Sequence, residues 1–214
     1  MFVTFEGIEG SGKSTALRGV AQALAAQGRT VVQTQEPGGC PLGTTLRAVL
    51  LDARTQNLAE RAELYLFLAD RAQHVHEVVR PALQAGSVVL CDRFCDSTFA
   101  YQGHGRGLDM AMLRQLNEQA TNGLMPDVTL LFDLPVEEGL ARARSRNAAT
   151  GQSQNEGRFE AEKLAFHQRV REGFLALAAA EPARFRIIDA SQGPEQVLAA
   201  VLAALSPTLK LRFS

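Results

Sequence analysis

The sequence predicts an α/β fold in which one doubly wound, five-stranded parallel sheet is flanked by helices. Five short hydrophobic runs alternate with segments of helical periodicity along the 214 residues. Such alternation is typical of parallel strands that are joined by right-handed helical crossovers. The chain is 46% hydrophobic, which is enough for one well-buried core. We therefore expect a single domain over residues 1–214, with one mobile appendage.

The first predicted strand runs directly into a glycine-rich turn. Residues 2–5 favour extended backbone, and residues 7–14, GIEGSGKS, match the phosphate-loop pattern GxxxxGK(S/T) without a mismatch. Backbone N–H groups of such a loop surround an anion at the start of the next helix, here expected over 13–27. Lys13 can reach the β- and γ-phosphates of a nucleoside triphosphate, and the Ser14 hydroxyl can bind Mg²⁺. The predicted phosphate-binding residues are Gly7, Ile8, Glu9, Gly10, Ser11, Gly12, Lys13, Ser14 and Thr15. The alternative, a turn that binds nothing, is disfavoured by the strand before it and the helix after it.

A second strand, expected over 30–35, ends where the sequence EPGG begins. Glu36 and Pro37 therefore start a loop at the carboxyl end of a strand, where α/β sheets place their ligands. A short helix expected over 43–51 carries Arg47. We expect these residues at the same edge of the sheet as the phosphate loop.

A longer helical stretch is expected over 58–85, with an adjustment near Pro81. Phe67 and Arg71 are four residues apart on it, so an aromatic face and a guanidinium lie side by side. This arrangement suits stacking on a nucleotide base. The spacing is equally compatible with Phe67 in the core and Arg71 in a surface ion pair.

The third strand, within 86–93, is almost wholly apolar and ends in Asp92 and Arg93. The carboxylate can hold Mg²⁺ through water beside Ser14, and the arginine can bridge a phosphoryl donor and acceptor. A structural salt bridge is the alternative. The segment that follows supplies groups able to hydrogen-bond a base or sugar, namely Ser97, Thr98, Tyr101 and Gln102.

A fourth strand over 128–134 carries Asp133, a second candidate for the acid beside Mg²⁺. After it, Arg142, Arg144, Arg146 and Arg158 surround a small, polar stretch without apolar periodicity. This pattern predicts a flexible, cationic lid over about 142–160 that closes on a triphosphate; a solvated basic loop is the alternative. The remaining expected elements are helices over 109–122 and 160–180, a strand over 184–190 and a last helix capped by Ser191.

Composition and charge exclude several classes of protein. The formal charge of −1 gives no general basic surface, so we expect no nucleic-acid polymer as a partner. No stretch approaches the ~20 apolar residues of a membrane span, and we see no hydrophobic signal-peptide region. We therefore expect no membrane contact and a cytoplasmic location. Cys40, Cys91 and Cys95 are expected to be reduced thiols and not disulfide partners or metal ligands.

Four motifs together resemble those of the bacterial thymidylate kinases, which belong to the P-loop nucleoside monophosphate kinase group. The motifs are FEGIEGSGKST, TQEPGG, CDRFCDSTFAYQGHGRGLD and PDVTLLFDLP, and the similarity spans nearly the whole length. The resemblance implies phosphorylation of thymidine 5′-monophosphate (dTMP) to the diphosphate, with ATP as donor and Mg²⁺. It also implies the strand order 2-3-1-4-5 and a homodimer formed through helices. Another P-loop small-molecule kinase and a nucleotide-dependent switch remain as alternatives, although the sequence has no NKxD-type guanine motif.

The resemblance assigns several residues to the acceptor nucleotide. It implies that Arg47 and Arg93 hold the monophosphate and that Phe67 stacks on thymine. Glu9 would contact the acceptor sugar or its metal environment, and Tyr101 would crowd a ribose 2′-hydroxyl. The other residues expected around the acceptor are Glu36, Pro37, Arg71, Thr98 and Gln102. We also expect the Glu36–Pro37 peptide bond to be cis.

The resemblance further implies where the catalytic cation lies. In this family the catalytic arginine sits either in the phosphate loop or in the lid, and here Gly10 occupies the loop position. The lid must then supply it, and Arg158, within GRFE, is the best match despite the longer lid sequence NAATGQSQNEGR. The expected catalytic residues are Lys13, Asp92, Arg93 and Arg158, with Asp92 preferred to Asp133. Adenine is expected near Ser191 and Gln192.

Overall fold

The computed structural model describes residues 1–55, 57–150 and 157–209. Five strands form one parallel sheet in the order β2-β3-β1-β4-β5, which confirms the predicted order. The strands are β1 (Phe2–Glu6), β2 (Val31–Gln35), β3 (Val88–Asp92), β4 (Val128–Asp133) and β5 (Phe185–Asp189). All five residues of the central strand β1 are buried, as expected for a strand covered by helices on both faces.

Neighbouring strands end in register at the carboxyl edge of the sheet. Phe5 of β1 lies opposite Asp92 of β3 and Leu130 of β4. The N–H of Glu36 donates to the carbonyl oxygen of Asp92 at 2.9 Å, and the N–H of Arg93 donates to that of Phe5 at 3.0 Å. The loops after β1, β2 and β3 therefore begin side by side.

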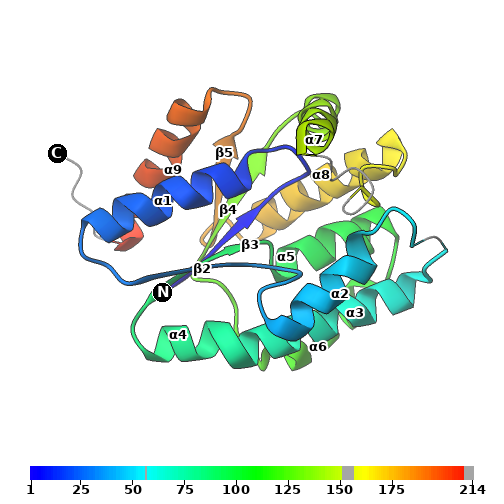
Figure 1. Cartoon of the computed structure of the whole chain (residues 1–214), viewed down its shortest axis with the longest axis horizontal. Helices are drawn as coiled ribbons and strands as arrows, with labels where there is room; N and C mark the ends of the chain where they lie inside the picture. Colours follow the sequence, from blue (N-terminus) through cyan, green and yellow to red (C-terminus); the bar gives the residue numbers. More distant parts are fainter. Residues whose placement is uncertain (56, 151–156, 210–214) are drawn as a thin grey trace.

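Helices cover both faces of the sheet, with α1 and α9 together on one side and α3, α4 and α6 on the other (Figure 1). Their bounds are α1 (Lys13–Ala26), α2 (Pro41–Leu51), α3 (Glu60–His74), the π-helix η1 (Val75–Val79), α4 (Arg80–Gln84), α5 (Cys95–Thr98), the π-helix η2 (Phe99–Gly105), α6 (Met110–Thr121), α7 (Val136–Thr150), α8 (Leu164–Ala180) and α9 (Pro194–Leu209). Among the described helices, none combines the length and apolar character needed to span a bilayer.

Packing decides the local conformation of two segments. The segment 95–105, for which the sequence predicted hydrogen-bonding groups but no helix or strand, is helical as α5 and η2. Most of its side chains are buried, and η2 packs along α8. The first part of the expected lid is also helical, since α7 continues to Thr150. A buried stripe of Val136, Leu140, Ala143 and Asn147 gives α7 the helical period that the arginines obscure. The expected lid residues 151–156 lie outside the described residues.

Other expected boundaries are shifted by a few residues. The stretch expected over 58–85 is helical from Glu60 to Gln84, and its irregular turn is η1, just before Pro81. The helix expected from residue 160 begins at Leu164. The last helix begins at Pro194, so Ser191 does not cap it; instead the Ser191 hydroxyl donates to Asp189 Oδ1 at 2.6 Å.

Two further expectations are confirmed. The Glu36–Pro37 peptide bond is cis. Cys40, Cys91 and Cys95 are buried free thiols.

Candidate active site

The phosphate loop, residues 7–14, joins β1 to α1 and passes directly against α7. Gly10 has a φ of 71°, and a Cβ atom built there would lie 2.0 Å from the carbonyl oxygen of Gly139 in α7. A side chain at this position would therefore collide with the backbone of α7, in a conformation that L-residues rarely adopt. The loop cannot carry an arginine at residue 10 without moving α7.

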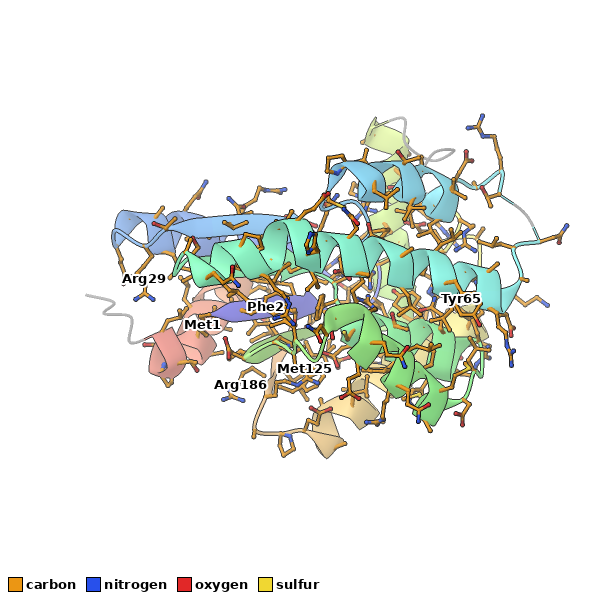
Figure 2. The ribbon with its side chains drawn as sticks, turned by 90° about the horizontal axis from the view of Figure 1, so that it is seen from below. Met1, Phe2, Arg29, Tyr65, Met125 and Arg186 are labelled. Atoms are coloured by element: carbon orange, nitrogen blue, oxygen red, sulfur yellow. The ribbon has the colours of Figure 1, made fainter. Side chains whose placement is uncertain are left out.

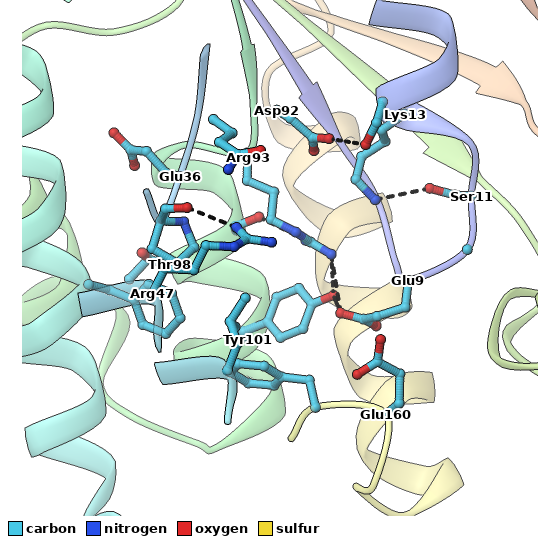
Figure 3. Close-up of a pocket in the computed structure, with 18 of the residues that line it drawn as sticks. Glu9, Ser11, Lys13, Glu36, Arg47, Asp92, Arg93, Thr98, Tyr101 and Glu160 are labelled. Carbon is cyan, nitrogen blue, oxygen red and sulfur yellow. Dashed lines mark hydrogen bonds and ion pairs between the residues drawn. The ribbon is translucent and has the colours of Figure 1, made fainter. Parts of the chain in front are cut away.

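Lys13 folds back over this loop. Its Nζ donates to the carbonyl oxygens of Ile8 at 2.7 Å and Gly7 at 3.0 Å, and to Ser11 Oγ at 3.2 Å (Figure 3). Burial, with the nearby positive charge of Arg93, lowers the pKa of Lys13 to about 8. The ammonium group is thus held at the loop, in surroundings that favour an anionic ligand.

Ser14 and Asp92 meet at the mouth of the loop. The Ser14 hydroxyl donates to Asp92 Oδ2 at 2.6 Å, which joins the start of α1 to the end of β3 (Figure 3). These oxygen atoms are of the type that Mg²⁺ takes as ligands, so the pair fits the expected ion. The rival acid, Asp133, is instead held by two hydrogen bonds from Arg171 of α8, at 2.7 and 2.8 Å.

A cavity of about 420 Å³ opens between the phosphate loop and α3. It brings together seventeen of the predicted residues from five different segments: Glu9, Gly10, Ser11, Gly12, Lys13, Ser14, Thr15, Glu36, Pro37, Arg47, Phe67, Arg71, Asp92, Arg93, Thr98, Tyr101 and Gln102. Among the described residues expected at the phosphates, at the acceptor or in catalysis, Gly7, Ile8 and Arg158 do not line it. Convergence of this kind at the carboxyl edge is typical of a binding site in an α/β fold.

Arg93 is at the centre of this cavity and is held by a cluster of polar side chains. Its Nη2 donates to Glu9 Oε1 and lies 3.1 Å from the Tyr101 hydroxyl oxygen, while its Nη1 donates to Ser97 Oγ at 3.1 Å (Figure 3). Burial opposes the charge of Glu9, but His167, Arg93 and Tyr101 outweigh it and lower the pKa of Glu9 to about 2. Glu9 is therefore a carboxylate, and Arg93 stays cationic beside it.

A second buried acidic side chain, Glu6, supports the turn that presents Arg93. Arg93 has a φ of 71°, which is uncommon for a residue with a side chain. The next N–H, of Phe94, donates to Glu6 Oε1 at 2.7 Å, and the Ser97 hydroxyl donates to Glu6 Oε2 at 2.6 Å. Burial and the nearby Asp96 raise the pKa of Glu6 to about 8. Sequence reasoning missed Glu6, although its place at the end of a buried strand matches that of Asp92.

Arg71 forms the floor of the cavity on the side of α3. Its guanidinium donates to Glu36 Oε2 at 2.7 Å, Thr98 Oγ1 at 2.8 Å, Asn117 Oδ1 at 2.5 Å and the Phe94 carbonyl oxygen at 2.9 Å. These bonds use four of its five N–H groups. The ion pair with Glu36 is buried, with side chains 2% exposed on both sides, so the surface ion pair considered as an alternative is wrong. Arg71 therefore holds neighbouring segments of the cavity lining together and is itself part of that lining.

Glu36 has both of its carboxylate oxygens occupied. Oε2 accepts from Arg71, and Oε1 lies 2.8 Å from His74 Nδ1. Its contribution to the site is to hold these two side chains. Phe67, by contrast, is half-buried, packs near Phe159 with ring centroids 6.2 Å apart, and presents its ring to the cavity.

Gln102 leads to a buried group on α3 that sequence reasoning missed. Its Nε2 donates to Glu63 Oε1 at 2.9 Å, and Glu63 Oε2 also pairs with Arg106 at 3.2 Å and Arg158 at 2.7 Å. Arg158 further donates to the carbonyl oxygen of Leu50. The predicted lid cation is therefore anchored behind the cavity wall. It lies in the turn before α8, which begins at Leu164.

Arg146 of α7 lines the cavity instead. Its side chain is 55% exposed and lies 3.6 Å from Glu160, which also lines the cavity. Ser97, which the sequence offered as a hydrogen-bonding group for a base or sugar, lines the cavity too, and the lining residues that were not predicted are Arg18, Gln35, Leu51 and Phe159. Spacing alone could not have separated Arg146 from the three other arginines of this region.

A second cavity of about 450 Å³ lies across the phosphate loop from the first, since Gly10, Ser11 and Gly12 contribute to both. Ser191 and Gln192, in the loop after β5, form part of its wall. Arg142 closes another side and donates to the carbonyl oxygen of Ala190 at 2.9 Å. The phosphate loop therefore has one cavity on each side of it.

Comparison with known proteins gives one consistent result. A family model described as thymidylate kinase matches residues 5–201. A thymidylate kinase of Solidesulfovibrio magneticus is 63% identical over 94% of this chain and 96% of its own length, and one of Desulfovibrio desulfuricans is 62% identical over 99% and 98%. A crystal structure of thymidylate kinase from Ehrlichia chaffeensis superimposes with a TM-score of 0.77 at 32% identity, covering 96% of this chain and 98% of that one.

Proposed function

This chain belongs to the thymidylate kinase family and transfers the γ-phosphoryl group of ATP to dTMP, and from that premise we propose which of its residues perform the transfer. The observation that carries the proposal is one cavity in which Lys13, the Ser14–Asp92 pair and Arg93 face a half-buried aromatic ring, Phe67. Family membership sets aside the two alternative functions, a kinase for another small molecule and a nucleotide-dependent switch.

On the donor side, the phosphate loop cradles the triphosphate and Lys13 supplies the charge at its β- and γ-phosphates. Binding frees Lys13 from the carbonyl oxygens of Gly7 and Ile8 that it now contacts. Ser14 and Asp92 would hold Mg²⁺, Ser14 directly and Asp92 through water. When bound, the ion neutralises charge on the phosphates.

On the acceptor side, Arg93 holds the monophosphate, and Arg47 adds a second positive charge. Arg47 Nη1 donates to the carbonyl oxygen of Pro37 at 2.8 Å, which keeps the guanidinium beside the loop after β2. Phe67 stacks on thymine. Arg71, Thr98 and Gln102, which line the cavity, contact the edge of the base or its surroundings. Glu36 acts indirectly, because Arg71 occupies one of its carboxylate oxygens.

Glu9 and Tyr101 define the space beside the acceptor sugar. The Tyr101 hydroxyl donates to Glu9 Oε1, and Arg93 lies over the Tyr101 ring, 4.9 Å from its centroid. The ring is thus held against the site from two directions. We propose that it leaves no room for a ribose 2′-hydroxyl, which selects the deoxynucleotide.

Arg146 is proposed as the lid cation in place of Arg158. The γ-phosphoryl oxygens carry the charge that an arginine must stabilise as the bond to ADP loosens. Arg146 is exposed at the cavity, whereas Arg158 is tied to Glu63 behind the wall. We propose that residues 1–214 form a single domain and that the lid is part of it.

The second cavity is proposed as the adenine site, because it adjoins the phosphate loop and includes Ser191 and Gln192.

We also propose a homodimer formed through helices. Exposed apolar side chains on two helices support this proposal: Leu42 and Val49 on α2 and Tyr65 on α3 are 46%, 43% and 53% exposed, and Figure 2 shows Tyr65 on α3.

We also propose a cytoplasmic location. Substrates that are free nucleotides, together with three free thiols, support it.

The test of the acceptor assignment is Arg93→Ala. Any residue other than glycine bears the strain of the φ of 71°, so the substitution adds no backbone cost. We expect kcat/KM for dTMP to fall about 100-fold or more, with little change in the KM for ATP, in a coupled ADP-release assay. Arg186→Ala is the matched control and should behave as wild type, because Arg186 is a half-buried arginine on β5 that hydrogen-bonds to backbone carbonyl oxygens of residues 182 and 183. A rise in the KM for ATP with an unchanged KM for dTMP would place Arg93 on the donor side and refute the assignment.

A further inference from the structure

His167 of α8 is completely buried beside the phosphate loop, and sequence reasoning gave it no role. Its Nδ1 lies 3.4 Å from Glu9 Oε2. Within the described residues, five buried side-chain nitrogen and oxygen atoms have no hydrogen bond of good geometry, and three of them are Glu9 Oε2 and the two ring nitrogens of His167. Most of these buried polar atoms without a hydrogen-bond partner therefore lie at one contact.

Physical chemistry decides how this contact is protonated. A buried polar atom without a partner costs about 1–3 kcal/mol, and more when the group is charged. If Nδ1 carried a lone pair, two acceptors would face each other at 3.4 Å beside a full negative charge. With its proton on Nδ1, the ring instead directs an N–H at the carboxylate and gives both atoms a partner. The proton therefore belongs on Nδ1.

The two oxygens of Glu9 then have separate partners. Oε1 is held by Arg93 and Tyr101, whereas Oε2 faces His167 of α8. Without the second contact, the carboxylate could turn about its last bond and carry the Arg93 guanidinium with it. We propose that His167 is a positioning residue that orients Glu9, and through Glu9 also Arg93, for phosphoryl transfer. The inference rests on the roles proposed above for Glu9 and Arg93.

The contact also couples two parts of the site that are distant in sequence. Helix α8 follows directly on the turn that contains Phe159 and Glu160, both of which line the cavity. His167 of this helix contacts Glu9 in the phosphate loop.

The charges around Glu9 give a signature that simple packing would not. The titratable groups that face it are Lys13 of α1, Arg93 after β3, Tyr101 of η2, Glu160 of the turn before α8, and His167. His167 is the leading cause that lowers the Glu9 pKa against the effect of burial. Its loss raises that pKa. Glu9 then loses its charge, and Arg93 loses its partner, at a higher pH than in wild type.

The experiment compares His167→Phe, which keeps a ring but removes both nitrogens, with His167→Asn, whose amide N–H can take the place of Nδ1–H. We expect His167→Phe to lower kcat/KM for dTMP about tenfold, as for the loss of one charge-assisted hydrogen bond, and His167→Asn to restore most of it. The ratio of the His167→Phe rate to the wild-type rate should fall as the pH is lowered from 7 to 5. His104→Phe is the control, because His104 packs against α8 at Gly173. The ratio of the His104→Phe rate to the wild-type rate should not change over this pH range.

A Glu9→Gln background separates this inference from the function it rests on. There, His167→Phe should have almost no further effect. If Glu9→Gln is itself as active as wild type, the role of Glu9 fails and this inference fails with it. If Glu9→Gln is impaired but His167→Phe is not, or adds its full effect to Glu9→Gln, His167 is merely packing and only this inference fails. Independently of any variant's folding, ¹⁵N NMR of the wild-type imidazole should show a proton on Nδ1, and a ring protonated on Nε2 alone would overturn the proposal.

Discussion

Replacing Arg146 with alanine should separate catalysis from stability more cleanly than any other change in the lid region. The side chain is 55% exposed, its contact with Glu160 is long, at 3.6 Å, and its hydrogen bonds to Asn147 Oδ1 are to the next residue of the same helix. Exposed ion pairs contribute about 0.2–1 kcal/mol, so the free energy of unfolding should fall by less than about 1 kcal/mol. In a protein of this size that corresponds to about 2–4 °C in Tm. The variant should therefore fold normally.

Its effect on turnover should be far larger. The guanidinium lies at the cavity, where charge develops on the transferred phosphoryl group. Removing one such stabilising donor typically lowers kcat about 10²- to 10³-fold, and an interaction made mainly in the transition state leaves both KM values nearly unchanged. A coupled ADP-release assay at saturating ATP and dTMP, with differential scanning fluorimetry on the same samples, measures both quantities.

Arg158→Ala is the matched comparison, and it should show the opposite pattern. Arg158 and Glu63 have side chains 11% and 1% exposed, and their ion pair is 2.7 Å long. Loss of this buried pair should lower the free energy of unfolding by about 1–3 kcal/mol. Because Glu63 also holds Gln102, the KM for dTMP should rise. If Arg158→Ala lowers kcat about 10²-fold without loss of stability, and Arg146→Ala does neither, the assignment of the lid cation to Arg146 is refuted.

Three other substitutions test separate parts of the site. Lys13→Ala should remove most phosphoryl transfer and leave the fold intact, since the ammonium group of Lys13 hydrogen-bonds to Gly7, Ile8 and Ser11 of the phosphate loop; near-normal turnover in a folded variant would contradict the loop's role. Phe67→Ala should raise the KM for dTMP by about 5- to 150-fold, from the 1–3 kcal/mol of base stacking, and leave the KM for ATP unchanged; the reverse result would place Phe67 outside the acceptor site. Burial and Glu36 raise the pKa of Asp70 from 3.8 to about 6. Its contribution to stability is therefore present below pH 4 and lost as the pH rises through 6, by at most about 3 kcal/mol. Thermal unfolding should show Asp70→Asn gaining stability relative to wild type between pH 4 and 7, and a constant difference would show that Asp70 is not perturbed.

The sequence predicted those parts of the site that follow from local geometry. A phosphate loop needs glycines and a lysine at defined positions, so GIEGSGKS located Lys13 and Ser14 without a structure. Parallel strands end at one edge, which placed Glu36 and Arg93 beside that loop. Spacing could not decide between Asp92 and Asp133. That choice depends on tertiary contacts, namely Ser14 for Asp92 and Arg171 for Asp133.

What sequence reasoning missed depends on packing between distant segments. The polar run before residue 105 resembles a loop, but burial against α8 makes it helical, and this places Tyr101 and Gln102. The lid arginines are locally equivalent. Only the length of α7 and the anchoring of Arg158 on Glu63 distinguish Arg146 as the one at the cavity. A single buried histidine such as His167 carries no signal in a sequence.

A crystal structure of the protein with dTMP and ADP would show whether dTMP binds in the cavity between Phe67 and Arg93, across from Lys13. We predict the thymine ring against Phe67, the monophosphate within hydrogen-bonding distance of Arg93, and the phosphates of ADP at Lys13 with adenine in the second cavity, near Ser191. Density for dTMP in the second cavity, or a monophosphate held by residues other than Arg93, would contradict this placement.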